Sequence, residues 1–307
     1  SSAASDVYKR QLADRPCGIL ESLLLAASGL LLALATAHAA DPYRIEIVDA
    51  GNGWPVPLVE LETVHGVKVV SDNAGLIAFD VPETMGRETW CRVRGFGYGV
   101  PRDGFGFEGV RFTPRPGGTL RVPVERRVVA KRLGRTTGAG IFAESQKLGE
   151  RQDWPESGVV GCDSVQHAIL DGALVWLWGD TSLARYPLGI FDGTAARTPL
   201  RALQRFEPPV ALRFDYWRDA SGAPKAIAAM HAHGPTWLTG VTSVPDAAGS
   251  VRLVASFMKI EPPMEAYRTG LCVWDAAAER FTELKVIWER SEDARRSPPL
   301  LEGHSVE

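Results

Sequence analysis

The chain has 307 residues, room for two domains, and its 45% hydrophobic and 23% charged residues exclude wholesale disorder. Its 34 basic and 37 acidic residues give a formal net charge of -3, which offers no electrostatic footprint for nucleic acid or an anionic membrane. The counts of 31 Gly, 21 Pro and 9 Trp favour many short strands over long helices.

The first forty residues have the features of a targeting segment and not of a folded domain. Residues 1–11 resemble the translation of a transposase adapter used in preparing sequencing libraries, so they are left out of the predicted fold. A charged flank, an apolar run over 23–37 and an Ala-x-Ala site at 37–39 are the three parts of a secretory signal. The run is shorter than the ~20 apolar residues of a spanning helix. We therefore expect a signal peptide over 12–39, with a signal anchor as the alternative, and an exported mature chain without a stable membrane span, whether periplasmic, cell-surface or extracellular.

Loss of the signal would remove Cys17 and leave Cys91, Cys162 and Cys272. These three cysteines lack the short spacing of a zinc site. In an oxidising compartment the sequence allows either one disulfide or three buried thiols.

Residues 41–127 read as short strands separated by turn residues. Strands are expected over 43–49, 56–63, 67–71, 76–79, 90–94 and 120–124, with Ile45 and Ile47 on the same side of the first. Turn signals at this near-regular spacing are typical of a β-sandwich.

Two segments of this region carry a family resemblance. The strand 56–61 and the turn and strand over 71–79 are similar to the transthyretin-like fold of carboxypeptidase regulatory domains, in which a "pxxGaxV" strand precedes a "TDxxGxf" turn. Here Ser71 replaces the usual Thr, and Leu58 and Val59 replace small residues. The resemblance covers about 43–126 and implies a non-catalytic module for stability or surface attachment.

The Gly- and Phe-rich segment 103–109 is interpreted as a loop that folds its rings back onto the sandwich, with an aromatic ligand loop as the alternative. Residues 128–135 form a basic connector, and because the rest of the chain is not basic we interpret it as a charged linker. Strand–turn–strand units with recurring Trp then follow over 174–181, 236–258 and 269–288, a pattern typical of propeller blades. The predicted propeller region is 136–290, followed by a polar tail over 291–307.

This second region resembles bacterial five-bladed propeller families with a "D-S/T … dG-x-x-W-x-x-G-D-T" opening blade. The matching residues are Asp163-Ser164, Asp171-Gly172 and the stretch from Trp176 to Gly179-Asp180-Thr181. Those families include furanose-directed glycoside hydrolases, so the resemblance implies an exported carbohydrate-active protein. A complete ring needs on the order of 250 residues. The predicted fold class is thus all-β: a small transthyretin-like β-sandwich followed by an incomplete five-bladed β-propeller.

Glycoside hydrolysis needs two carboxyl groups that flank the scissile bond. The resemblance implies Asp163 as base and Asp180 as the second carboxylate, with Glu261 or Glu265 as a further acid from a later blade. The alternative is that these carboxylates only cap turns, in a non-catalytic surface scaffold or a carbohydrate-binding protein.

Aromatic rings in a propeller funnel would stack on the C–H faces of a sugar, and each candidate ring has burial in a blade core as its alternative. The candidates are Trp178, Tyr186, Trp217 and Trp237. His231 and His233 form a period-two pair without the further ligands of a metal site, so no metal or other cofactor is expected. The expected partner is a polysaccharide or glycan.

Overall fold

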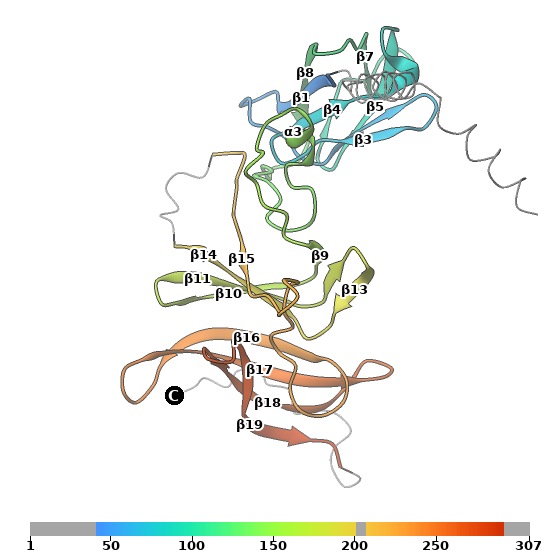
Figure 1. The fold of residues 1–307 in the computed structure, drawn as a ribbon. Coiled ribbons are helices and arrows are strands. Elements are labelled where there is room, and N and C mark those ends of the chain that lie inside the picture. The colour runs from blue at the N-terminus through green and yellow to red at the C-terminus, as the bar shows by residue number, and fades with distance from the viewer. Residues whose placement is uncertain (1–40, 201–206, 292–307) are drawn as a thin grey trace, which may run out of the picture. The chain divides into compact units, whose positions relative to one another are not determined.

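The computed structural model describes residues 41–200 and 207–291, with the side chains of 186–188 excepted, so the expected signal peptide and nearly all of the polar tail lie outside the described residues. Strands dominate the described chain (Figure 1), which confirms the predicted all-β class. Its helices are the short α3 (Ala143–Lys147) and the 3-10 turn η1 (Pro82–Thr84). No described helix has the length and hydropathy that a membrane crossing requires.

The first group of strands forms one eight-stranded sheet that nearly closes on itself, in the order β3-β2-β5-β6-β8-β1-β4, with β7 paired to β5. It closes because β8 is long: its residues 119–124 pair in parallel with β1, and Glu125 and Arg126 pair with β6. The strands are β1 (Tyr43–Asp49), β2 (Val59–Thr63), β3 (Lys68–Val70), β4 (Leu76–Phe79), β5 (Thr89–Gly95), β6 (Tyr98–Gly99), β7 (Gly109–Phe112) and β8 (Thr119–Arg126).

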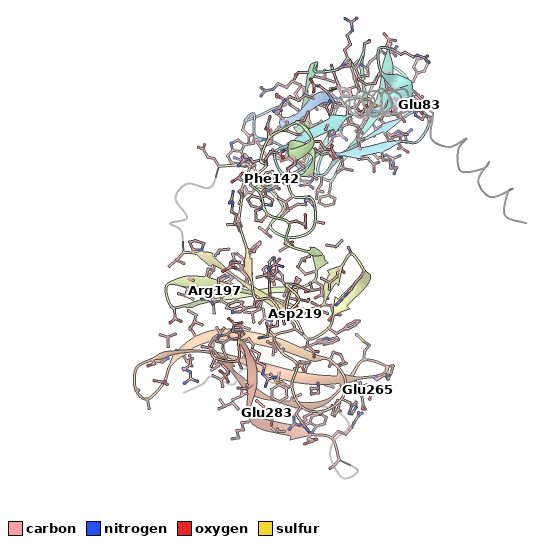
Figure 2. All side chains as sticks on the ribbon, viewed as in Figure 1. Glu83, Phe142, Arg197, Asp219, Glu265 and Glu283 are labelled. Carbon is pink, nitrogen blue, oxygen red and sulfur yellow. The ribbon has the colours of Figure 1, made fainter. Side chains whose placement is uncertain are left out.

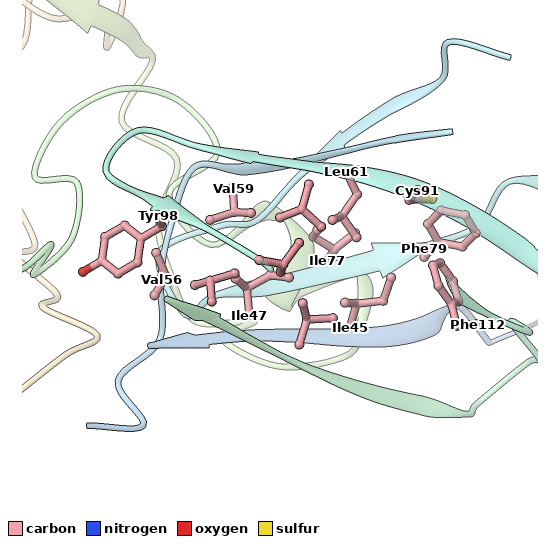
Figure 3. Packing of buried hydrophobic residues seen from close by; sticks show 14 of the residues in the cluster. Ile45, Ile47, Val56, Val59, Leu61, Ile77, Phe79, Cys91, Tyr98 and Phe112 are labelled. Carbon is pink, nitrogen blue, oxygen red and sulfur yellow. The ribbon is translucent and has the colours of Figure 1, made fainter. Parts of the chain in front are cut away.

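The interior of this sheet is an apolar core drawn from alternate strand positions (Figure 3). On β1, Tyr43, Ile45 and Ile47 point inward, the side that the sequence pattern predicts. Ile45 and Ile47 are fully buried, and each such side chain contributes roughly 1.5–3 kcal/mol relative to an exposed one. The core therefore holds the sheet closed, and its outer face remains available for other contacts.

The turn over 71–75 is buried, which the sequence pattern alone does not require of a turn. Gly75 has a φ of +70°, and a Cβ there would lie 2.5 Å from the carbonyl oxygen of Ile47, so only glycine fits. Asp72 is 2% exposed, and its Oδ1 accepts the backbone N–H groups of Ala74 at 2.9 Å and Leu76 at 3.2 Å.

The same turn holds the segment that follows the basic connector. Asp72 Oδ2 accepts hydrogen bonds from the backbone N–H of Ser145 at 2.6 Å and from its Oγ at 2.7 Å. Glu144 Oε2 accepts the backbone N–H of Ala78 at 2.9 Å, so α3 packs on β4. Residues 143–147 thus belong physically to the first group of strands, although they lie beyond the expected linker.

The second group of strands forms three antiparallel sheets: β10-β11-β14-β15, β13-β12-β9 and β16-β17-β18-β19. Strands cover the expected Trp-rich stretches. Their bounds are β9 (Val159–Cys162), β10 (Val165–Leu170), β11 (Ala173–Trp178), β12 (Thr181–Leu183), β13 (Tyr186–Ile190), β14 (Thr194–Pro199), β15 (Asp215–Tyr216), β16 (Thr236–Pro245), β17 (Val251–Glu261), β18 (Glu265–Asp275) and β19 (Arg280–Glu289).

Strand β11 is apolar at nearly every position because it buries both faces. Val175 and Leu177 join a core cluster that also contains Leu253, Phe257 and Trp274 of the last sheet. Since side chains alternate across a strand, the intervening Trp positions turn to the other face and pack in a separate cluster with residues of β15. The Trp-x-Trp spacing is thus a consequence of strand geometry.

Candidate functional site

Asp163 and Asp180 lie together at a paired bend. Residues 163–164 separate β9 from β10, and residues 179–180 separate β11 from β12. Strand β10 pairs with β11, and β12 pairs with β9. Both segments of the chain therefore pass from one sheet to another at the same place. The backbone N–H of Asp163 donates to the carbonyl of Asp180 at 3.0 Å, and the N–H of Asp180 donates to Asp163 Oδ1 at 2.9 Å.

The bend depends on Gly179. A Cβ at this position would lie 2.4 Å from Asp163 Oδ1 and 2.6 Å from Ser164 Oγ, so any larger residue would displace the Asp163 carboxylate. Ser164 Oγ also contacts Asp163 Oδ1 at 3.3 Å. By these contacts Asp163 joins the two segments of the chain that meet at the bend. This is the turn-capping role that the sequence left open as an alternative to catalysis.

Asp180 has a different environment. Partial burial raises the pKa of its carboxyl group, and the neighbouring carboxylates of Asp163 and Asp192 raise it further. The Trp237 side chain opposes this shift in pKa. Oδ1 of Asp180 is buried, yet no described residue forms a well-aligned hydrogen bond with it. An unsatisfied, partly buried carboxyl oxygen is costly, and such groups are concentrated at functional sites.

Two cavities adjoin this carboxylate, and Asp180 and Trp237 line both. The first has a volume of about 270 Å³ and is also lined by Asp163 and Gln166. The second has a volume of about 640 Å³ and is also lined by Glu261. The structure therefore brings all three acids of the sequence-based hypothesis to one connected region, with Asp180 at its centre.

Glu261 is held by other charged groups. Its Oε1 forms an ion pair with Arg290, and its Oε2 lies 3.0 Å from His233 Nε2. His233 in turn stacks on Tyr267 with ring centroids 4.3 Å apart. Glu265, labelled in Figure 2, pairs with Arg290 at 2.8 Å and is exposed. Glu261 thus reaches the cavity as part of an ion-pair network, whereas Glu265 does not line it.

The aromatic candidates divide between cavity and core. Trp237 is half-buried and lines both cavities. Trp178 is buried and stacks on Tyr216 with centroids 5.3 Å apart, although it lines the smaller cavity. Trp217 packs against Trp274 in the core cluster and lines neither cavity, so its position fits the core alternative. Tyr186 belongs to β13, and its side chain lies outside the described residues.

Sequence reasoning missed two charged residues near Asp180. Asp192 Oδ1 accepts the backbone N–H of Thr236 at 2.7 Å, and its charge acts on both Asp180 and the buried Lys259. Lys259 Nζ donates to the carbonyl of Gly234 at 2.5 Å, and burial lowers the pKa of its ammonium group. The only sequence signal was the Asp192-Gly193-Thr194 run, which contains the residue types of the 179–181 bend.

The remaining expectations concern metal and thiols. Among residues 41–200 and 207–291, no group of three or more His, Cys, Asp or Glu is arranged to hold a metal ion. The period-two spacing of His231 and His233 would suit one face of a strand, but both residues lie in a bend before β16. Cys91, Cys162 and Cys272 are all free thiols, the first and last of them buried.

No protein-family model matches the sequence, and no curated protein matches it.

Proposed function

We propose that the chain is an exported carbohydrate-active protein whose site is the pair of cavities around Asp180, with the second group of strands as blades of an incomplete propeller and the first group as a transthyretin-like module. The observation that supports this most is the Asp180 carboxyl: partly buried, with a raised pKa, and shared by two cavities. The half-buried Trp237 beside it offers a ring for a sugar face.

In the proposed hydrolysis Asp180 is the general acid, because partial burial and the neighbouring carboxylates favour its protonated form over its charged form. Asp163 is the partner that acts as base, and the hydrogen bond from the Asp180 N–H holds its Oδ1 in place. Glu261 borders the larger cavity, where its ion pair with Arg290 orients it toward bound hydroxyl groups.

The test is a screen of the full chain against furanose and pyranose polysaccharides, followed by assays of single-residue variants on the best substrate. We expect Asp180→Asn to lower turnover by about 10²–10⁴-fold, since it removes a proton donor and preserves side-chain shape. Asp163→Asn keeps an oxygen for the Asp180 N–H and loses the negative charge, so it should lower turnover too.

The matched control is Asp246→Asn, because Asp246 Oδ1 caps the N–H groups of Ala248 and Ser250 in a remote turn. Equal turnover in wild type and Asp180→Asn would remove the catalytic assignment. Binding of a polysaccharide without turnover, weakened by Trp237→Ala, would instead identify a carbohydrate-binding protein, the second function that these cavities support.

A further inference from the structure

The outer face of the first sheet carries a separate pair of adjoining hollows where β5 lies between β2 and β7. Their volumes are about 530 and 410 Å³, and Thr63, Val64, Trp90 and Arg111 line both. Each volume is within the roughly 300–1,000 Å³ usual for small-ligand sites. Every lining residue belongs to the first group of strands or its loops, so this face is independent of the Asp180 region.

An indole ring forms the boundary between the two hollows. Gly109 on β7 lies against it: a Cβ at 109 would be 2.4 Å from both Cε2 and Cζ2 of Trp90. The ring is therefore packed directly on the backbone of β7, which is accessible only because residue 109 has no side chain. Phe107 meets the indole edge-on, with centroids 6.1 Å apart and an interplanar angle of 77°.

The Gly- and Phe-rich loop fixes that second ring. Asp103 Oδ1 accepts the backbone N–H groups of Phe105 and Phe107, each at 2.9 Å. Phe107 folds back onto the sheet, as the sequence predicts, but Phe105 is 89% exposed and does not. Because Trp90 and Phe107 are already held in place, a ligand that stacks on them orders few side chains when it binds.

Polar groups beside the indole suit a ligand rich in hydroxyl groups. Arg92 is half-buried, lines the larger hollow beside Glu62, and forms no ion pair with a described residue. The charges around the hollows nearly cancel, which argues against a polyanion, whose binding requires a cationic surface. They are Arg87, Arg92 and Arg111 against Glu62, Glu83, Glu88 and Asp103.

We propose that this face binds a neutral polysaccharide chain, with the C–H face of one sugar ring on Trp90 and hydroxyl groups bonded by Arg92 and Glu62. The ligand class is the one in the proposed function, but the inference rests on different residues. It would make the first group of strands a binding module that anchors the chain to a glycan.

The test is affinity electrophoresis of the full chain in gels that contain neutral polysaccharides (xylan, arabinan or β-glucan) or the acidic polygalacturonate. We expect a neutral polymer to retard the wild type, and Trp90→Ala to weaken that binding by about tenfold, as for loss of a stacked aromatic face. Gly109→Val, which displaces the indole, and Arg92→Gln should weaken it as well. Trp54→Ala is the matched control, because this tryptophan lies under Lys131 and lines neither hollow.

The inference is overturned if no neutral polymer retards the wild type, or if Trp90→Ala and Arg92→Gln both bind as the wild type does. Retardation only by polygalacturonate, abolished by salt, would also overturn it. Should Trp90→Ala unfold, Arg92→Gln still decides, because Arg92 has no ion pair to lose. Retardation that Trp237→Ala weakens and Trp90→Ala leaves unchanged would assign the binding to the cavities around Asp180, so the failure of one proposal is distinguishable from the failure of the other.

Discussion

At the scale of single residues, Asp163 and Asp180 show how similar sequence positions acquire different properties. Both are acids at a bend between two strands, but Asp163 is exposed and accepts a backbone N–H, whereas Asp180 is partly buried with an unsatisfied Oδ1. The sequence motif predicts that both acids belong to the functional site. The raised pKa of Asp180 follows from its partial burial and from the neighbouring carboxylates of Asp163 and Asp192, which come from other parts of the chain.

The raised pKa of Asp180 predicts a pH-dependent effect on stability. A carboxyl whose pKa is higher in the folded than in the unfolded chain stabilises the fold below its unfolded pKa, about 3.9, and this contribution is lost as pH rises through the folded pKa. Relative to Asp180→Asn, the wild type should therefore lose stability from acidic to neutral pH. Urea unfolding of both proteins across that range measures the difference.

Asp219, labelled in Figure 2, is the control of opposite sign. Hydrogen bonds from Ser221 lower the pKa of its carboxyl, so its contribution is present at neutral pH and is lost as pH falls through the folded pKa. At neutral pH Asp219→Asn should therefore be less stable than the wild type. A stability difference for Asp180→Asn that does not change with pH would contradict the raised pKa.

At the scale of elements, the turn over 71–75 joins neighbouring parts of the chain. Its sequence predicts a turn between two strands, and the structure has one. The burial of Asp72 and its bonds to Ser145 depend on α3 packing against β4, a contact between residues 73 positions apart. Local pattern predicts where a chain turns and does not predict what later covers the turn.

The effect of burial on a turn carboxylate can be measured by comparing two similar turns. Asp72→Ala leaves the N–H groups of Ala74, Leu76 and Ser145 without their acceptor, at about 1–3 kcal/mol for each buried group that stays unpaired. We expect a loss of about 3 kcal/mol or more in the free energy of unfolding by urea.

Asp246→Ala removes a turn carboxylate that is 32% exposed, and water can replace it at the freed N–H groups, so the expected loss is about 1 kcal/mol or less. Equal losses for Asp72→Ala and Asp246→Ala would show that burial of the first turn does not matter.

At the scale of the whole molecule, the described chain has apolar clusters with no shared members. One lies inside the first sheet and contains Cys91; another lies between sheets of the second group and contains Cys272. Burial raises the pKa of the Cys91 thiol to about 11 and that of the Cys272 thiol to about 12. Separate cores predict that the two groups of strands unfold as separate cooperative units.

Pulsed labelling with a thiol reagent along a urea gradient, mapped by peptide mass spectrometry, tests this. In the native chain Cys91 and Cys272 should be protected, because burial keeps both thiols protonated and out of reach of the reagent. With denaturant the two should become reactive at different urea concentrations. The half-buried Cys162 should react earliest of the three. Exposure of Cys91 and Cys272 in a single transition would show one cooperative unit.

The amino-acid pattern alone determined the all-β class, the position of most strands and the inward side of β1, because each of these follows from alternation and turn residues within a few positions. The pattern did not predict β7, nor the packing of the Trp90 indole on Gly109, because that contact depends on how β5 and β7 pair.

Only the tertiary structure decided that Trp237 lines the cavities and Trp217 joins the core. It also decided that the Asp180 carboxyl is partly buried beside other carboxylates and so has a raised pKa. Burial and charge at a site are set by side chains that come from distant parts of the chain, and a local sequence pattern carries no information about those distances.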